Sequence, residues 1–219
     1  MHEARALLGE AGKEIGLVAK LERAEAVASD ATLDGIIEAS EAVMVARGDL
    51  GVEIGDEALI GTQKRIIKHA RTLNRAVITA TQMMESMINN FSPTRAEVND
   101  VANAVMDGAD AVMLSAETSV GNHPVEVIKA MYKIIMRVEQ EEDLYYKPFS
   151  PVLREDRFIS DCICANASSM ARTVKAQGIV TMTFSGYTAF KVSAFRPNCY
   201  VYVFTSNRDI LKMLSLVWG

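Results

Sequence analysis

The sequence predicts an α/β protein: the second half of a (β/α)8 barrel followed by part of a smaller α/β domain with a parallel sheet. Four apolar runs have the composition of strands buried on both faces. Each run ends in a group of polar or charged residues, and the active site of a parallel barrel lies at the carboxyl ends of its strands. The runs are LVAKLE (17–22), AVMVARGDLG (42–51), AVITATQMMES (76–86) and AVMLSAET (111–118).

The regular spacing of these runs indicates a repeated βα unit. Chemically active residues at successive strand ends are 29, 32 and 34 positions apart, and a (β/α)8 barrel of about 250 residues allots roughly 31 to each unit. Residues 56–73 have the pattern of an amphipathic helix. Residues 94–108 begin with Thr94 and Glu97, which can form a capping box, and end at a glycine that can stop a helix. This alternation predicts parallel strands joined by helical crossovers.

Only four such units are present, and one short helical segment, residues 2–8, precedes them. A half-barrel leaves two edge strands unpaired and a core face uncovered. We therefore expect the chain to be a piece of a larger protein, with Met1 an internal methionine and both ends truncated.

The composition indicates a soluble globular protein, because 49% of the 219 residues are hydrophobic. The net charge of −5 and the pI of about 5.3 argue against binding of nucleic acid or an anionic membrane surface. No run approaches the roughly 20 apolar residues that span a bilayer, and no signal peptide is visible, so we expect a cytoplasmic location. Cys162, Cys164 and Cys199 are odd in number and lack a metal-finger spacing, which favours reduced thiols over a redox site.

A change of composition near residue 140 marks a domain boundary. Residues 140–143 are acidic and residues 146–157 contain two prolines, as in an exposed connector. We predict barrel residues 1–139, a linker over 140–157 and a second domain over 158–219. Its expected elements are a helix over 159–176, strands over 178–184 and 199–205, a further segment over 187–195, a helix over 207–214 and a final strand cut off at 216–219.

The strand ends suggest the chemistry of the site. Lys20 and Glu22 are two positions apart and would share one face of a strand. Asp49 adds a second carboxylate, and two carboxylates with open positions suit Mg²⁺, which also recruits phosphate oxygens of a substrate. Gly48 and Gly51 would let backbone N–H groups approach a ligand closely.

The third and fourth strand ends add Thr81, Ser115 and Glu117. The alternative is that all these groups only cap strands, but four strands in step rarely end in such chemistry by chance. The sequence therefore favours an enzyme site.

The motifs AKLE, MVARGDLGVEI, ITATQMMESMI, PTRAEVNDVANAVMDGADAVMLSAET and GNHPVE resemble pyruvate kinase over residues 20–126. The second domain is similar to the start of that family's C-terminal domain. The resemblance implies transfer of phosphate from phosphoenolpyruvate to ADP, giving pyruvate and ATP in the last step of glycolysis. It also implies a homotetramer that needs Mg²⁺ (or Mn²⁺) and K⁺. The residues that bind K⁺ in this family lie outside this chain.

The resemblance also implies roles for individual residues. Lys20 would stabilise the transferring phosphoryl group, and Glu22 and Asp49 would bind the metal. Gly48 and Asp49 would contact the carboxylate of phosphoenolpyruvate. Thr81 would contact the substrate near the enolate carbon that is protonated. Ser115 and Glu117 would take part in the proton relay.

A loop in the second domain resembles the effector site of the family. Thr183, Ser185, Gly186 and Thr188 lie between a strand and a helix, where hydroxyls and backbone N–H groups can cradle a phosphate. The resemblance implies a sugar-phosphate or nucleotide effector. Tyr187 stands where a basic residue is common, which weakens the charge argument, and an ordinary strand–turn–helix junction is an equal alternative.

Two other functions stay open at this point. One is a different Mg²⁺-dependent barrel, a lyase or aldolase acting on pyruvate-type acids, and the other is a non-catalytic assembly fragment.

Several parts of the family's active site have no counterpart here. They are the arginine that holds the substrate phosphate, the K⁺ ligands and the inserted lid domain. We therefore expect the isolated chain to be inactive and poorly folded.

Overall fold

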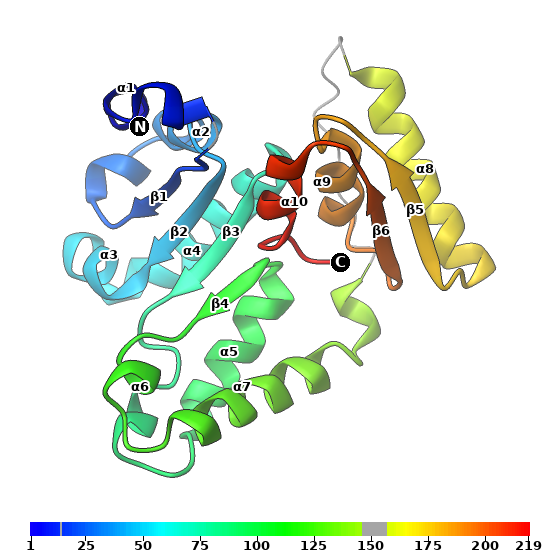
Figure 1. Ribbon diagram of the computed structural model, residues 1–219. Coiled ribbons are helices and arrows are strands. Elements are labelled where there is room, and N and C mark those ends of the chain that lie inside the picture. Colours follow the sequence, from blue (N-terminus) through cyan, green and yellow to red (C-terminus); the bar gives the residue numbers. More distant parts are fainter. Residues whose placement is uncertain (14, 146–156) are drawn as a thin grey trace.

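The computed structural model describes residues 1–13, 15–145 and 157–219, which form two parallel sheets flanked by helices (Figure 1). The elements, in chain order, are α1 (His2–Leu7), the 3₁₀ helix η1 (Gly9–Lys13), β1 (Val18–Leu21), η2 (Ala24–Val27), α2 (Asp30–Glu38), β2 (Ala42–Ala46), α3 (Arg47–Ile54), α4 (Asp56–Thr72), β3 (Ala76–Ala80), η3 (Glu85–Ile88), α5 (Arg95–Asp107), β4 (Ala111–Met113), α6 (Ala116–Ser119), α7 (Pro124–Val138), η4 (Glu142–Leu144), α8 (Phe158–Val174), β5 (Gly178–Met182), α9 (Tyr187–Ala194), β6 (Tyr200–Phe204) and α10 (Arg208–Leu214).

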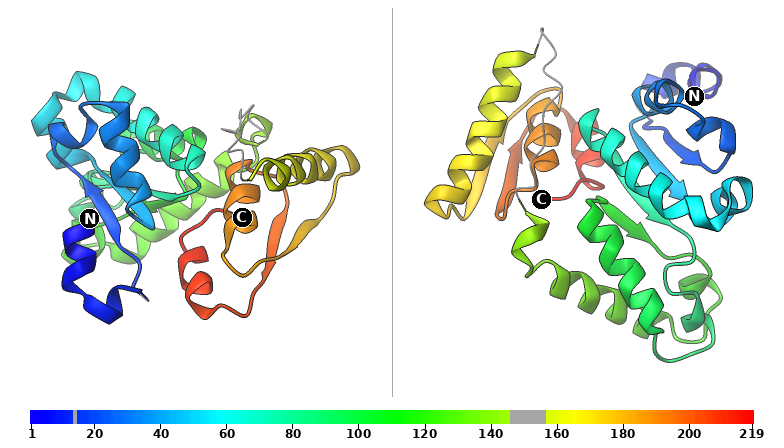
Figure 2. Two further views of the ribbon diagram at one scale, coloured as in Figure 1. Left: turned by 90° about the horizontal axis from the view of Figure 1, so that it is seen from above. Right: turned by 180° about the vertical axis from the view of Figure 1, so that it is seen from behind.

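The first sheet has the strand order β1-β2-β3-β4, and every pair is parallel. Leu21 pairs with Val45, Ala46 with Ala80, and Ala80 with Met113, so the carboxyl ends of the four strands lie along one rim. Helices α4 and α5 cover one face of this sheet (Figure 2). The prediction of parallel strands with helical crossovers is confirmed.

Burial differs between the inner and the outer strands. All of β3 and four of the five residues of β2 are buried, whereas β1 alternates and Val18 is 42% exposed. Residues of β4 are only half-buried. The prediction that all four strands are buried on both faces is therefore wrong for β1 and β4, because each pairs with a strand on one side only among the residues that the structure describes.

The two predicted barrel helices are confirmed as α4 and α5. Thr94 accepts a hydrogen bond from the Glu97 N–H at 3.2 Å, and Glu97 accepts one from the Thr94 N–H at 2.7 Å, which completes the capping box. Gly108 ends α5 with a φ of 103°, a conformation that favours glycine. Residues 30–38 and 124–138 form two further helices, α2 and α7, that were not predicted from the sequence.

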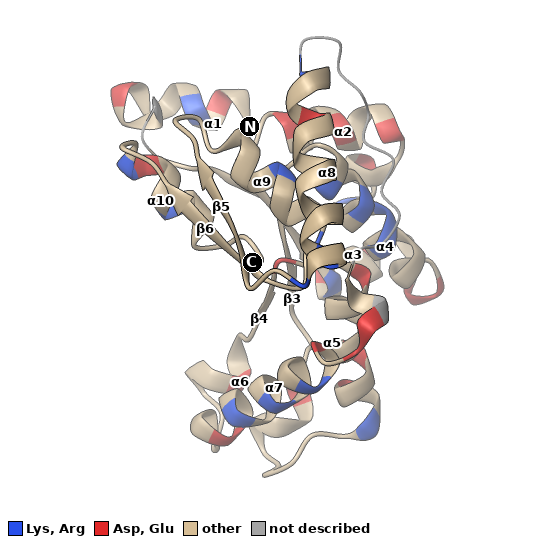
Figure 3. Cartoon of the chain, turned by 90° about the vertical axis from the view of Figure 1, so that its right-hand side faces the viewer, with Lys and Arg blue, Asp and Glu red and all other residues tan. Residues whose placement is uncertain are grey.

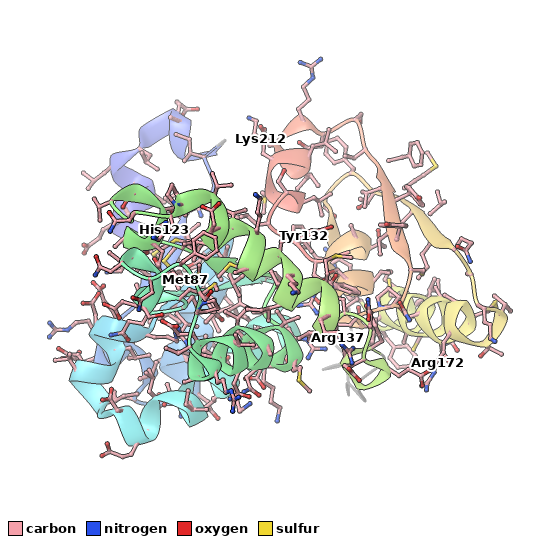
Figure 4. All side chains as sticks on the ribbon, turned by 90° about the horizontal axis from the view of Figure 1, so that it is seen from below. Met87, His123, Tyr132, Arg137, Arg172 and Lys212 are labelled. Carbon is pink, nitrogen blue, oxygen red and sulfur yellow. The ribbon has the colours of Figure 1, made fainter. Side chains whose placement is uncertain are left out.

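The barrel half has two main apolar clusters. The larger one joins β1–β3 to α2 and α4, with Leu33 and Ile37 packed in the same cluster as Ile66 and Ile67. The second lies under the loop that follows β3 and contains Met83, Met84, Met87, Val101, Ala104, Val127 and Met131. Seen from below, Met87 and His123 lie at the amino end of α7 (Figure 4). The loop after β3 is thus packed from beneath by α5 and α7.

The second domain has β5 and β6 paired in parallel, with α8 and α9 packed on them around Cys164, Val192 and Phe195. Its predicted helices and strands are confirmed, but residues 216–219 do not form the expected strand. The Trp218 N–H instead donates to Asp110 at 3.2 Å, and the Trp218 carbonyl accepts from Ser193. Side chains rather than a strand ladder therefore hold this segment.

Arg196 joins the two domains. It is 2% exposed, has a φ of 50°, and donates to Asp110 at 2.9 Å and to the Gly108 carbonyl at 2.5 Å. The other oxygen of Asp110 accepts the Val77 N–H at 2.9 Å, at the start of β3. Arg71 of α4 donates to the Ala194 carbonyl at 2.8 Å. Burial, and then the nearby charge of Arg196, lower the pKa of Arg71 to about 10, so it stays protonated at neutral pH.

Within the described ranges, none of the helices has both the length and the apolar content needed to cross a membrane.

Candidate active site

Lys20, Glu22 and Asp49 meet at the rim of the first sheet. The Lys20 Nζ lies 2.9 Å from Asp49 Oδ2 and also forms an ion pair with Glu22 Oε2. The side chains are 50%, 35% and 62% exposed for Lys20, Glu22 and Asp49. Hydrogen bonds to Glu22 and then to Asp49 raise the pKa of Lys20, and the bond from Lys20 lowers the pKa of Asp49. Lys20 and Asp49 are thus both charged at neutral pH, and all three side chains are accessible to a ligand.

The strand ends explain this convergence. Strand β1 ends at Leu21, so Glu22 lies just beyond the strand rather than on it, but it still reaches Lys20. Strand β2 ends at Ala46 and α3 starts at once, which puts Asp49 in the first turn of a helix. A carboxylate is favourable in that position because the amino end of a helix carries partial positive charge.

Thr81 follows β3 in an unusual backbone conformation. Its φ is 65° and that of Gln82 is 53°, values that are strained for residues with a side chain. The Thr81 hydroxyl accepts the Gly48 N–H at 3.0 Å and donates to the Ala80 carbonyl at 2.7 Å. The structure therefore brings Thr81 beside the segment that carries Asp49.

Arg47 holds this arrangement, a role that its sequence motif did not predict. It is 4% exposed, and its guanidinium donates to the Thr81 carbonyl at 2.6 and 3.2 Å and to Asp100 at 2.5 Å. A buried arginine needs such partners. One feature of the sequence could have indicated this role: Arg47 directly follows a buried strand, and a charged residue there must either have a partner or reach solvent.

Ser115 and Glu117 lie at the fourth strand end, but no hydrogen bond or ion pair among the described residues joins them to Lys20, Glu22 or Asp49. Glu117 is 2% exposed. Its carboxylate accepts the Ser115 N–H at 2.7 Å and the Met84 N–H at 3.2 Å. In this structure Glu117 ties the loop after β4 to the loop after β3.

The candidate effector loop joins β5 to α9, as predicted. The Gly186 N–H donates to the Thr183 hydroxyl at 3.0 Å, and the Tyr187 N–H donates to the Ser185 hydroxyl at 3.4 Å. The Thr188 hydroxyl accepts from Thr181 at 3.0 Å. Gly186 has a φ of 80°, and a Cβ there would lie 2.9 Å from both Ile210 and Phe190 side chains, so the turn requires glycine.

Comparison with known proteins identifies the family. The barrel domain of pyruvate kinase matches residues 1–128, and the alpha/beta domain of pyruvate kinase matches residues 161–219. The chain belongs to the pyruvate kinase family. The resemblance seen in the sequence motifs is thereby confirmed.

Several bacterial pyruvate kinases are similar over the whole chain. Identity is 47% over 220 residues to pyruvate kinase of Buchnera aphidicola subsp. Acyrthosiphon pisum, 46% to that of Haemophilus influenzae and 47% to pyruvate kinase II of Salmonella typhimurium. Each match covers 100% of this chain and 46% of the relative. The chain thus spans about half the length of these curated relatives.

The residues at the rim of this pyruvate kinase chain fit a divalent metal that keeps water or substrate ligands. The described residues contain no group of three or more His, Cys, Asp or Glu side chains placed to hold a metal. The carboxylates of Glu22 and Asp49 both form an ion pair with the Lys20 ammonium. Both carboxylates can therefore reach the same positively charged group. Mg²⁺ typically uses one or two carboxylates together with water and phosphate oxygens.

Proposed function

We propose that this chain supplies part of the active site of a pyruvate kinase that transfers phosphate from phosphoenolpyruvate to ADP and yields pyruvate and ATP. The supporting observation is the convergence of Lys20, Glu22 and Asp49 at the rim, with Thr81 beside them. An ammonium group and two carboxylates suit a phosphorylated substrate that is bound together with a divalent cation. We also infer a cytoplasmic homotetramer for the whole protein.

The charged residues would act on the transferring phosphoryl group. Glu22 and Asp49 would hold Mg²⁺ or Mn²⁺, which when bound neutralises charge on the phosphate oxygens. Lys20 would contribute a fixed positive charge where negative charge spreads over the transferring group. Because both carboxylates already accept from Lys20, its ammonium is oriented before substrate binds. K⁺ is expected in the whole enzyme, from ligands outside this chain.

Thr81 would contact the substrate on the side where the enolate carbon takes up a proton. Its hydroxyl is oriented by Gly48 and Ala80, and its carbonyl by Arg47. The N–H groups of Gly48 and Asp49 are the candidates for contact with the substrate carboxylate. A hydroxyl or an ordered water is acid enough to protonate an enolate, and we assign Ser115 and Glu117 to this proton relay.

The loop containing Thr183, Ser185, Gly186 and Thr188 is our candidate for binding the phosphate of a sugar-phosphate or nucleotide effector. It combines hydroxyls and backbone N–H groups in one turn. Loss of activation in a Ser185→Ala, Thr188→Val variant of the whole enzyme would support this assignment, and unaltered activation would count against it.

The metal role is tested in the whole enzyme with a lactate-dehydrogenase-coupled assay. Glu22→Gln should shift the Mg²⁺ titration to higher concentration, because a neutral amide is a poorer ligand for a hard cation. Glu25→Gln, at a carboxylate that is 76% exposed and paired with Arg23, is the control and should leave the titration unchanged. An unchanged titration in Glu22→Gln would remove Glu22 from the ligand set.

The isolated 219-residue chain should show no turnover in the same assay. Turnover by the chain that is abolished by Lys20→Met would contradict that expectation and would place a complete active site within these residues.

A further inference from the structure

Thr81 and Gln82 are two successive residues in a strained backbone conformation, directly after β3. Their φ angles are 65° and 53°, and no other adjacent pair of non-glycine residues within the described ranges has positive φ. Such conformations are costly, persist only where the surrounding structure holds them, and are concentrated at active sites and ligand-binding positions. The strain at Gln82 therefore indicates a functional constraint at this position.

The peptide that joins the two residues is held by the buried Arg47. The Thr81 carbonyl belongs to this peptide, and it accepts hydrogen bonds from the Arg47 guanidinium at 2.6 and 3.2 Å. Arg47 is in turn paired with Asp100 at 2.5 Å. The Thr81 hydroxyl also accepts the Gly48 N–H at 3.0 Å. These bonds fix the direction in which the chain, and with it the Gln82 side chain, leaves β3.

The Gln82 side chain is exposed and lies against Gly48. Its Cδ and Nε2 are 3.8 and 3.9 Å from the position that a Cβ would take at Gly48, which is ordinary van der Waals contact. Among the described residues, no hydrogen bond occupies the Gln82 amide. The amide is thus a donor beside the turn that carries Gly48 and Asp49.

The donors at this strand end are neutral. Strands β3 and β4 carry no charged side chain (Figure 3), and the first charged residue after β3 is Glu85. Lys20 is already paired with Glu22 and Asp49. A ligand carboxylate beside Gly48 would therefore meet backbone N–H groups and the Gln82 amide. An amide nitrogen supplies two N–H donors, and a hydrogen bond to an ionised acceptor is roughly twice as strong as one between neutral groups.

We propose that Gln82 is a further substrate-binding residue, whose amide donates to the carboxylate of phosphoenolpyruvate beside the N–H groups of Gly48 and Asp49. The inference rests on the proposed function of this rim and adds a residue to it. The strained backbone of Thr81 and Gln82 then has a purpose, because it turns the amide toward Gly48 instead of continuing the strand.

Calorimetric titration of the whole enzyme with phosphoenolpyruvate, in the presence of Mg²⁺ and without ADP, tests this contact. Gln82→Gly removes the amide but keeps a residue that adopts positive φ freely. It should raise the dissociation constant about tenfold or more, because a hydrogen bond to a charged acceptor is lost. Gln82→Glu should raise it further, because a carboxylate would then face the carboxylate of the substrate. Gln140→Glu, the same substitution at an exposed glutamine beyond the end of α7, is the control and should leave the constant unchanged.

Gln82→Ala separates the side chain from the backbone. Alanine removes the amide, as glycine does, but it disfavours positive φ. Similar weakening in Gln82→Ala and Gln82→Gly would support a contact through the amide. Weakening in Gln82→Ala with an unchanged dissociation constant in Gln82→Gly would show that only the backbone matters, and would overturn the proposal.

Turnover of the unsubstituted enzyme in the lactate-dehydrogenase-coupled assay tests the kinase assignment separately. Turnover there, with the same phosphoenolpyruvate dissociation constant in Gln82→Gly, Gln82→Glu and the unsubstituted enzyme, would overturn the Gln82 proposal alone. Neither turnover nor binding of phosphoenolpyruvate by the unsubstituted enzyme would overturn both. Binding without turnover would count against the kinase assignment alone, and weaker binding by Gln82→Gly would then still support the contact.

Discussion

Substitution of Arg47 by methionine tests how the strained Thr81 is held. The guanidinium makes two hydrogen bonds to the Thr81 carbonyl and one to Asp100, and it is nearly inaccessible. Removing one partner of a buried ion pair costs about 3–5 kcal/mol, and the lower end applies because Asp100 is 27% exposed. If Thr81 or Gln82 relaxed from its positive φ, the release of backbone strain would offset this loss by about 1–3 kcal/mol per residue. Thr81 keeps its bond to Gly48, so only part of that strain is released.

We therefore expect Arg47→Met to lower the free energy of unfolding by about 2 kcal/mol. Urea unfolding of the whole enzyme, followed by far-UV circular dichroism, measures this change. Arg137→Met is the matched control, because Arg137 forms a surface pair with Glu141 at 2.6 Å and its loss should cost about 0.5 kcal/mol or less. The Cα chemical shift of Gln82, which reports its positive φ, should change in Arg47→Met and should stay the same in Arg137→Met. Equal losses in the two variants, with an unmoved Gln82 shift, would refute the reasoning.

Three further predictions concern stability and ionisation. Lys191→Met should lower the free energy of unfolding of the whole enzyme by about 3–5 kcal/mol, because it removes the ammonium group paired with the buried Asp161 carboxylate. A urea midpoint equal to that of the unsubstituted enzyme would contradict this. Thr94→Ala should lower the free energy of unfolding by about 1 kcal/mol through loss of the cap on α5. Glu97→Ala should lower it further, because Glu97 also accepts hydrogen bonds from Ser86 at 2.6 Å. The same urea titration compares the two variants, and a larger loss in Thr94→Ala would contradict this ranking. The ion pair between Lys20 and Asp49 should be intact at neutral pH. It should be lost at low pH, when the pH falls through the lowered pKa of Asp49 and its carboxylate is protonated. It should also be lost at high pH, when the pH rises through the pKa of Lys20, which lies above 10.5, and its ammonium is deprotonated. Carboxyl and ammonium NMR titrations check both limits, and an Asp49 pKa at or above 3.8 would show that the pair does not form.

Local signals in the sequence were enough to predict α4 and α5. Their amphipathic pattern and the capping box of Thr94 and Glu97 depend on residues a few positions apart, which a single sequence displays. The strand order and the shared rim followed from the repeat of strand and helix. The convergence of Lys20, Glu22 and Asp49 could likewise be predicted, because parallel strands bring their carboxyl ends to one edge.

Features that depend on distant residues could not be read in the same way. Arg47 is bound by Asp100, 53 positions away, so its role in holding Thr81 has no local signature. The segment 216–219 has the composition of a strand, but Trp218 bonds to Asp110, 108 positions away, instead of to β6. The reduced burial of β1 and β4 likewise follows from their place at the sheet edges and not from their composition.

Paramagnetic relaxation by Mn²⁺ tests the central claim most directly, because it reports which residues surround one metal position. With Mn²⁺ added to the whole enzyme, the NMR signals of Lys20, Glu22, Asp49 and Thr81 should broaden first, while those of the Thr183–Thr188 loop stay sharp. Glu22→Gln should require more Mn²⁺ for the same broadening. Uniform broadening over both domains, or sharp signals at Asp49 and Thr81, would contradict a shared metal and phosphoryl site at this rim.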